Sequence, residues 1–186
     1  MRIHATLSSS KANGKGNRYV IWTQGCSILC KECFNPQTHS FTDGFDISVP
    51  TLVKSIIDAN VDGVTITGGE PFDQKRELYK LVRLIRQKTN LNIIIYSGYN
   101  YIFLSSNRLC KKIIDLSDAI IAGQYDMTKR IQHSLYGSSN QEVILITSAF
   151  NSNDFKGPSI MEIIINQDGQ CVITGFPVME GKYGYT

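Results

Sequence analysis

Three cysteines crowd into one short segment of the sequence. Cys26, Cys30 and Cys33 have the spacing Cys-x3-Cys-x2-Cys and are three of the five cysteines among 186 residues. A secreted disulfide framework would distribute its cysteines differently, whereas such a cluster in a cytosolic chain more often binds a metal or reacts. The spacing therefore predicts a metal site or a reactive site on one loop.

The number of ligands in this loop distinguishes two kinds of metal site. A closed structural zinc site usually has four ligands, so zinc would need a further one from His39, Cys110 or Cys171. A cubane iron–sulfur cluster on three thiolates keeps one iron open, and an open iron can accept the amino and carboxylate groups of an amino acid. The count favours a reactive cluster, and zinc remains the alternative.

Two glycine-containing segments could complete a ligand site. Thr67-Gly68-Gly69-Glu70-Pro71 follows a predicted strand and precedes a predicted helix. Glycine permits positive φ and close backbone approach, so backbone groups could contact a ligand there, although glycines also end strands for steric reasons. Tyr96-Ser97-Gly98-Tyr99 ends the next strand, and Ser97 is either a ligand contact or a turn residue.

Alternating strands and helices must position these segments. Runs of β-branched and other apolar residues predict strands at 18–23, 64–67, 91–96, 119–122 and 143–146. Apolar residues on one helical face predict helices around 52–57, 78–85 and 109–116. Continuous apolar strands separated by helices indicate a parallel sheet that helices cover on at least one face.

The predicted fold is α/β, either a partial (β/α) barrel or a curved, mostly parallel sheet with a C-terminal β-hairpin. The strand–helix units are too few for a closed eight-fold barrel. Ligands of parallel sheets gather at the carboxyl ends of the strands, where the cysteine and glycine segments fall. Residues 161–166 and 171–174 predict the hairpin, with a turn at Asp168-Gly169. It either covers a sheet edge or reaches a partner.

Composition limits the class of protein, its partners and its expected localisation. Its 42% hydrophobic and 19% charged residues are typical of a soluble globular chain. The net charge is +3 without a run of like charges, so no nucleic-acid partner is expected. No apolar stretch approaches the ~20 residues that span a bilayer, and the first residues lack the apolar region of a secretory signal. We expect a single cytoplasmic domain over residues 1–186 with no membrane partner.

The cysteine and glycine motifs together resemble the radical S-adenosylmethionine superfamily. Cys26-Ser-Ile-Leu-Cys30-Lys-Glu-Cys33-Phe34 resembles its cysteine signature, and Gly68-Gly69-Glu70-Pro71 resembles its second motif. The resemblance implies a catalytic 4Fe-4S cluster on the three cysteines, whose open iron chelates S-adenosylmethionine. An electron from the cluster would cleave that cofactor to methionine and a 5′-deoxyadenosyl radical. The residues implied to bind the cofactors are Glu32, Cys33, Phe34, Gly68, Gly69, Glu70, Ser97 and Asn140.

Further segments resemble glycyl-radical activating enzymes, in particular the anaerobic ribonucleotide reductase activating proteins. The segments are Asn13-Gly14-Lys15-Gly16-Asn17-Arg18, Gln24-Gly25-Cys26 with Phe34-Asn35, and Tyr136-Gly137-Ser138-Ser139-Asn140-Gln141. The resemblance covers about residues 12–147 and leaves an extension at about 155–186. It implies that a partner protein loses a glycine Cα hydrogen and then carries a glycyl radical. The chemistry of such a cluster predicts a flavodoxin-like or other low-potential electron donor, and its open iron predicts oxygen sensitivity and an anaerobic or facultative setting.

Two departures from the family pattern leave other functions open. Ala122 stands before Gly123 where the family commonly has Asp, so Asp126 or another group would have to replace that carboxylate. The hairpin extends beyond the short core of these activases. The radical chemistry could therefore serve a peptide, a nucleotide or RNA, or the cysteines could hold a metal in a non-catalytic interaction module. His4, His39 and His133 are expected to be surface or core residues.

Overall fold

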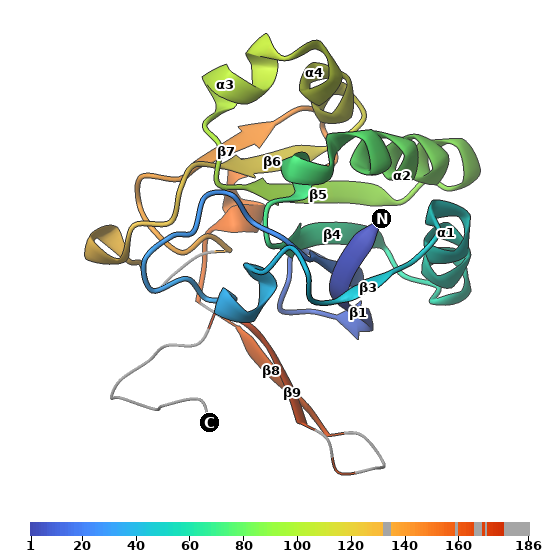
Figure 1. The fold of residues 1–186 in the computed structure, drawn as a ribbon, viewed down its shortest axis with the longest axis horizontal. Coiled ribbons are helices and arrows are strands. Elements are labelled where there is room, and N and C mark those ends of the chain that lie inside the picture. Colours follow the sequence, from blue (N-terminus) through green and yellow to red (C-terminus); the bar gives the residue numbers. More distant parts are fainter. Residues whose placement is uncertain (132–134, 159, 166–168, 170, 177–186) are drawn as a thin grey trace.

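A mostly parallel sheet forms the centre of the computed structural model, which describes residues 1–186 apart from 132–134, 159, 166–168, 170 and 177–186. The strand order is β3-β1-β2-β4-β5-β6-β7 (Figure 1). The strands are β1 (Arg2–Ser10), β2 (Arg18–Thr23), β3 (Phe45–Asp46), β4 (Gly63–Gly68), β5 (Asn92–Ser97), β6 (Ala119–Ala122) and β7 (Glu142–Leu145). β2, β4, β5 and β6 are parallel neighbours. The predicted α/β class and mostly parallel sheet are confirmed, and the partial barrel stays a prediction.

The central strands are apolar without alternation because both of their faces are buried. In β5, Ile93 and Ile95 pack in the core beneath the helices, whereas Ile94 packs on the opposite face with Phe150 and Phe155. All three isoleucines are fully buried. An unbroken apolar run is what a strand covered on both sides requires.

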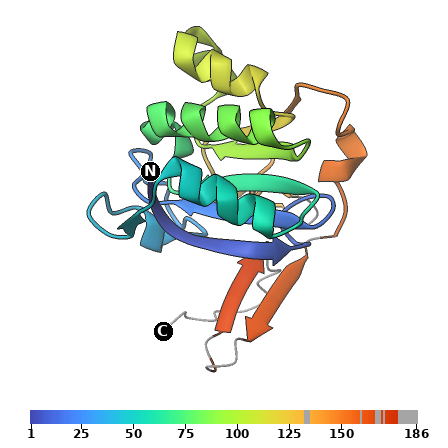
Figure 2. The ribbon, with the colours of Figure 1, turned by 90° about the vertical axis from the view of Figure 1, so that its right-hand side faces the viewer.

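Four helices contribute to the larger of these two cores. They are α1 (Val49–Asp58), α2 (Lys75–Lys88), α3 (Tyr101–Ser106) and α4 (Arg108–Asp115), and Figure 2 shows how they group together. In α2, Leu78, Leu81, Val82 and Ile85 form the buried stripe that the sequence pattern predicted. In α1 the apolar residues of the predicted stretch 52–57 are not all buried, because Ile57 is 45% exposed. None of the described helices has the length and apolarity needed to cross a membrane.

The outer strands differ from the prediction. β1 was not predicted, because its sequence contains polar residues and several of its side chains are exposed. It pairs antiparallel with β2 and with β3. The strand predicted at 143–146 is β7, which pairs antiparallel with β6 and is only partly buried. The helix α3 was also missed, since six residues are too few to establish a helical period.

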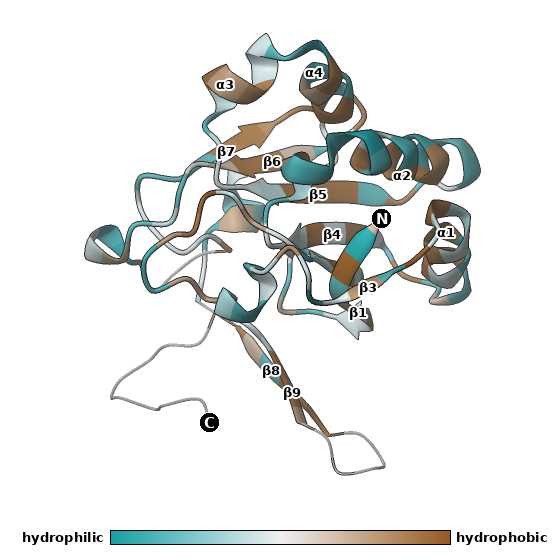
Figure 3. Cartoon of the chain, in the orientation of Figure 1, coloured by the Kyte–Doolittle hydropathy of each residue, from teal (hydrophilic) through white to brown (hydrophobic). Residues whose placement is uncertain are grey.

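The predicted C-terminal hairpin is confirmed. β8 (Met161–Ile165) and β9 (Cys171–Gly175) form a separate antiparallel pair that projects from the body (Figure 1). The turn predicted at Asp168-Gly169 lies largely outside the described residues. A carboxylate oxygen of Glu162 accepts the backbone N–H of Lys11 at 2.8 Å, and Asn13 Nδ2 donates to Thr174 Oγ1 at 2.8 Å. Apolar residues colour much of this projecting pair brown in Figure 3.

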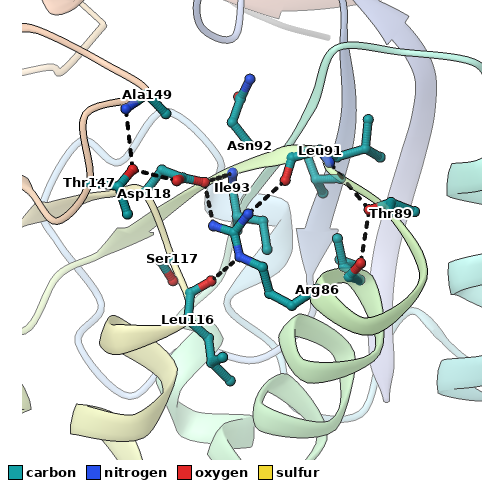
Figure 4. Close-up of polar contacts among 12 residues, drawn as sticks. Arg86, Thr89, Leu91, Asn92, Ile93, Leu116, Ser117, Asp118, Thr147 and Ala149 are labelled. Atoms are coloured by element: carbon teal, nitrogen blue, oxygen red, sulfur yellow. Dashed lines mark hydrogen bonds and ion pairs between the residues drawn. The ribbon is translucent and has the colours of Figure 1, made fainter.

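A partly buried ion pair connects the end of α2 to the strands β5 and β6 (Figure 4). The guanidinium of Arg86 contacts the carboxylate of Asp118, and its Nε donates to the carbonyl oxygen of Leu116 at 2.7 Å. The same carboxylate accepts the backbone N–H of Ile93 at 2.7 Å and the hydroxyl of Thr147 at 2.5 Å. The Asp118 side chain is only 7% exposed. Little water could therefore reach its hydrogen-bond partners if the carboxylate were removed.

We therefore predict that Asp118→Ala lowers the free energy of unfolding by about 3 kcal/mol, because it removes the charge partner of Arg86 and the acceptor of the Ile93 N–H. Urea unfolding would measure this as a lower midpoint with an unchanged slope. Asp58→Ala removes the exposed pair with Lys54 and serves as the control, with little or no change expected. Equal midpoints for the two variants would contradict the role assigned to Asp118.

Candidate metal centre

A cavity of about 560 Å³ lies where β2, β4 and β5 end. The loops that follow these strands line it, together with residues of β9. The sequence-predicted site residues along this cavity are Cys26, Cys30, Cys33, Phe34, Gly68, Gly69, Glu70 and Ser97. Glu32 and Asn140 are not among the lining residues. The structure thus brings eight of the ten predicted residues to one cavity.

The loop that carries the cysteines is closed at its base by backbone pairing. The N–H of Gly25 donates to the carbonyl oxygen of Thr38 at 2.8 Å, and the N–H of Cys26 donates to that of His39 at 3.1 Å. Between these points, Leu29 and Glu32 have φ values of 52° and 55°. Such left-handed backbone is unfavourable for residues other than glycine, by roughly 1–2 kcal/mol each. The loop therefore has a defined and locally strained shape.

Gly68 and Gly69 bring the end of β4 against the cysteine loop. An added Cβ at Gly68 would lie 2.4 Å from the nitrogen of Thr23, and one at Gly69 would lie 2.2 Å from the carbonyl oxygen of Gly25. The N–H of Gly69 donates to Thr23 at 2.8 Å, and the N–H of Glu70 donates to Gly25 at 2.9 Å. Close backbone approach is thus a sufficient reason for these glycines.

Glu70 is a buried carboxylic acid in the wall of this cavity. It is 1% exposed, and its Oε1 accepts the N–H of Phe72 and the hydroxyl of Ser97, each at 2.9 Å. Its Oε2 accepts the N–H of Gly98 at 2.7 Å. Burial raises the pKa of Glu70 to about 7, although these hydrogen bonds act in the opposite direction. Ser97 therefore contacts Glu70, and the acid connects the ends of β4 and β5.

The thiols of the cysteine loop are set among hydrogen-bond donors. Burial raises the pKa of the Cys26 thiol, and backbone N–H groups of Leu29 and Ile28 lower it in part. Burial likewise raises the pKa of the Cys33 thiol, and the backbone N–H of Asn35 lowers it in part. The nitrogen of Asn35 lies 3.4 Å from the Sγ of Cys33. N–H groups directed at sulfur stabilise thiolate ligands. The loop is suited to holding thiolates once a metal compensates for their burial.

A polar network next to Cys26 was missed by the sequence analysis. Asp73 accepts the N–H of Ser27 at 2.8 Å and its hydroxyl at 2.9 Å. The Tyr99 hydroxyl donates to the same carboxylate at 2.9 Å. This network connects the cysteine loop to the turn after Glu70 and to the residue after Gly98. Its members are far apart in sequence, so only the fold brings them together.

Aromatic side chains form another part of the cavity wall. The ring of Phe34 lies 4.8 Å from that of Tyr125 and 5.7 Å from that of Phe176, centroid to centroid. Phe176 also stacks on Tyr96 at 6.3 Å. Phe34 thus packs against protein rings, and it also lines the cavity. Phe176 follows β9, and no sequence signal connected it to this site.

The segment at 136–141 reaches the cavity through Gly137 and Gln141. Gln141 accepts the N–H of Gly137 at 2.9 Å and donates to the carbonyl oxygen of Gly123 at 3.0 Å. Asn140 is exposed, and its Nδ2 donates to the carbonyl oxygen of Gln124 at 2.8 Å. Asp126, considered as the replacement for the missing carboxylate, does not line the cavity and accepts hydrogen bonds from Thr128.

The donor set fits a cubane cluster, because a cubane takes each thiolate at a separate iron and does not need the sulfurs to converge on one point. Among the described residues, no group of three or more His, Cys, Asp or Glu side chains is placed to hold a single metal ion. Of the fourth ligands considered for zinc, His39 and Cys171 line the cavity and Cys110 does not. His133 lies outside the described residues.

Comparison with known proteins gives one family match and several relatives. The family described as a 4Fe-4S single cluster domain matches residues 12–144. The chain is 31% identical over 106 residues to the pyruvate formate-lyase-activating enzyme of Clostridium pasteurianum, covering 54% of this chain and 44% of that enzyme. It is 26% identical over 144 residues to the anaerobic ribonucleoside-triphosphate reductase-activating protein of Pasteurella multocida (strain Pm70), covering 73% of this chain and 91% of that protein.

The relatives differ in length. A pyruvate formate-lyase-activating enzyme of Staphylococcus aureus (strain USA300) is 34% identical over 92 residues, which are 46% of this chain and 37% of that enzyme. The chain therefore spans less than half the length of the two pyruvate formate-lyase-activating enzymes. The family match covers more than half of the 186 residues and contains all three clustered cysteines. The chain thus belongs to the family of 4Fe-4S single cluster domains, which confirms its predicted place in the radical S-adenosylmethionine superfamily.

Proposed function

We propose that this chain is a radical S-adenosylmethionine enzyme that generates a glycyl radical on a partner protein. The observation that carries the proposal is the convergence of three thiols, a glycine loop and a buried acid on one cavity. The relatives named as activating enzymes support the same class of reaction. Anaerobic ribonucleotide reductase is the partner class we propose, because the relative with that name aligns over most of its own length.

Cys26, Cys30 and Cys33 would hold a 4Fe-4S cluster, with S-adenosylmethionine at the iron that no thiolate binds. When bound and reduced, the cluster supplies the electron that cleaves this cofactor into methionine and a 5′-deoxyadenosyl radical, the species that abstracts hydrogen. The residues of the chain bind, orient and shield. Phe34, Tyr96 and Phe176 line the cavity with aromatic surface, which would shield a bound cofactor from water.

The protein groups around Glu70 would orient the amino acid part of the cofactor. Glu70 is the buried acid of the cavity wall, and an ammonium group nearby would stabilise its charged form. Because Glu70 also holds the Ser97 hydroxyl and the Gly98 N–H, its charge and the shape of the two strand ends are coupled. We propose that Glu70 positions this part of the site.

The cysteine assignment predicts which variants lose the cluster. After anaerobic reconstitution, Cys26→Ala, Cys30→Ala and Cys33→Ala should each lose most of the bound iron, since a cubane with two protein thiolates is weakly held. Cys110→Ala and Cys171→Ala are the matched controls and should keep both iron and brown colour, because neither belongs to the predicted set. Iron and zinc analysis of the purified proteins measures the outcome. A colourless wild-type chain with stoichiometric zinc would instead support the structural alternative.

The reaction itself is tested by quantifying 5′-deoxyadenosine after adding dithionite and S-adenosylmethionine to the cluster-loaded chain. We expect formation by the wild type and none by Cys30→Ala. With an anaerobic ribonucleotide reductase as partner, an electron paramagnetic resonance signal of a glycyl radical should appear. Formation of 5′-deoxyadenosine without that signal would keep the cofactor chemistry and reject this partner. If a loaded wild-type chain forms no 5′-deoxyadenosine, the enzymatic proposal fails.

The raised pKa of Glu70 predicts a pH-dependent stability of the cofactor-free chain. Because the pKa lies at about 7 against an ordinary 4.5, the folded chain holds this proton more tightly than the unfolded chain. The stabilisation of the folded chain is complete below pH 4.5 and is lost as the pH rises through 7. The total change in the free energy of unfolding from this group is at most about 3 kcal/mol. Glu70→Gln stays neutral, so its stability relative to the wild type should rise between pH 5 and 8 in urea unfolding. Parallel pH profiles would contradict the assignment.

A further inference from the structure

His39 presents a buried nitrogen with no hydrogen-bond partner. Within the described part of the chain, its Nε2 is the one buried side-chain nitrogen or oxygen in this condition. An unsatisfied buried polar atom costs about 1–3 kcal/mol, so such an atom in a folded protein usually has a ligand or a role. The sequence alone favoured a surface or core residue, and the structure adds that the ring has a buried nitrogen without a partner.

His39 lies beside Cys26 in the base of the cysteine loop. Its carbonyl oxygen accepts the N–H of Cys26 at 3.1 Å, and the neighbouring Thr38 accepts that of Gly25 at 2.8 Å. Residues 38–39 therefore lie beside residues 25–26, with the backbones of Cys26 and His39 in direct contact. His39 is among the residues that line the same cavity as all three cysteines.

His4 gives the contrast within the same cavity. It also belongs to the lining, but its Nδ1 lies 3.1 Å from Oε1 of Gln24 and so has a protein partner. The backbone carbonyls around His39 are also used, because its own N–H donates to Pro36 at 3.1 Å. No protein group among the described residues partners Nε2, so a group bound in the cavity could supply the missing acceptor.

We infer that the Nε2–H of His39 donates a hydrogen bond to a sulfur of the cluster at Cys26, and thereby positions the cluster and raises its reduction potential. The inference rests on the proposed function. A reduced cluster carries one more negative charge than an oxidised cluster, so a donor at its sulfur stabilises the reduced form more. His39 is a positioning residue in this scheme, and iron is bound by the cysteines alone.

The midpoint potential of the reconstituted cluster tests this inference without any turnover. His39→Leu removes the donor and should shift the potential to a more negative value. His39→Gln retains an N–H donor and should restore part of the shift. His4→Leu is the matched control and should leave the potential unchanged. Equal potentials for the wild type and His39→Leu would overturn the inference.

A measurement on the wild-type chain covers the case in which His39→Leu does not assemble a cluster. With ¹⁵N-histidine incorporated, pulsed electron paramagnetic resonance of the reduced cluster should detect a weak ring-nitrogen coupling that persists in His4→Leu. The absence of this coupling, or a coupling as large as that of a directly bound imidazole, would contradict a hydrogen bond. If the wild type assembles no cluster, the proposed function fails; if it assembles one without the coupling, only the role of His39 fails.

Discussion

Two backbone hydrogen bonds hold the cysteine loop against the end of β4, between segments too close to admit a side chain. An added Cβ at Gly69 would come within 2.2 Å of the Gly25 carbonyl oxygen, while the N–H of Glu70 donates to that same oxygen at 2.9 Å. This contact fixes Cys26 relative to Glu70, and Glu70 in turn holds Ser97 and Gly98. The positions of thiols, acid and second strand end therefore depend on one glycine-enforced approach.

Much of the fold could be predicted from the sequence because the parallel strands are buried on both faces. Such strands read as unbroken apolar runs, and the runs at Val64 and Ile93 were identified in this way. The antiparallel strand β1 gave no comparable signal, since exposed polar residues interrupt it. The direction of β7 depends on the connection after β6, which leaves no periodic pattern in the sequence.

The same distinction between local pattern and long-range packing explains which residues of the candidate site could be predicted. Predicted ligands that lie close together in sequence, such as Cys30 and Cys33, were selected by their spacing, because a short loop brings them to one cavity whatever the fold. Asp73 and Phe176 reach the site only through long-range packing, and nothing local distinguishes them. Asn140 was selected by resemblance, yet its side chain bonds the backbone of Gln124 and the neighbouring Gln141 lines the cavity.

The wall that residues 171–176 contribute has a consequence for how the protein matures. These residues follow the cysteine loop and all seven strands of the sheet along the chain. During synthesis from the N-terminus, the loop and its framing strands leave the ribosome before that wall does. If iron and sulfide bind at this stage, they would enter through a side that has not yet closed. The order of the sequence thus separates formation of the cysteine loop from closure of the chamber around it.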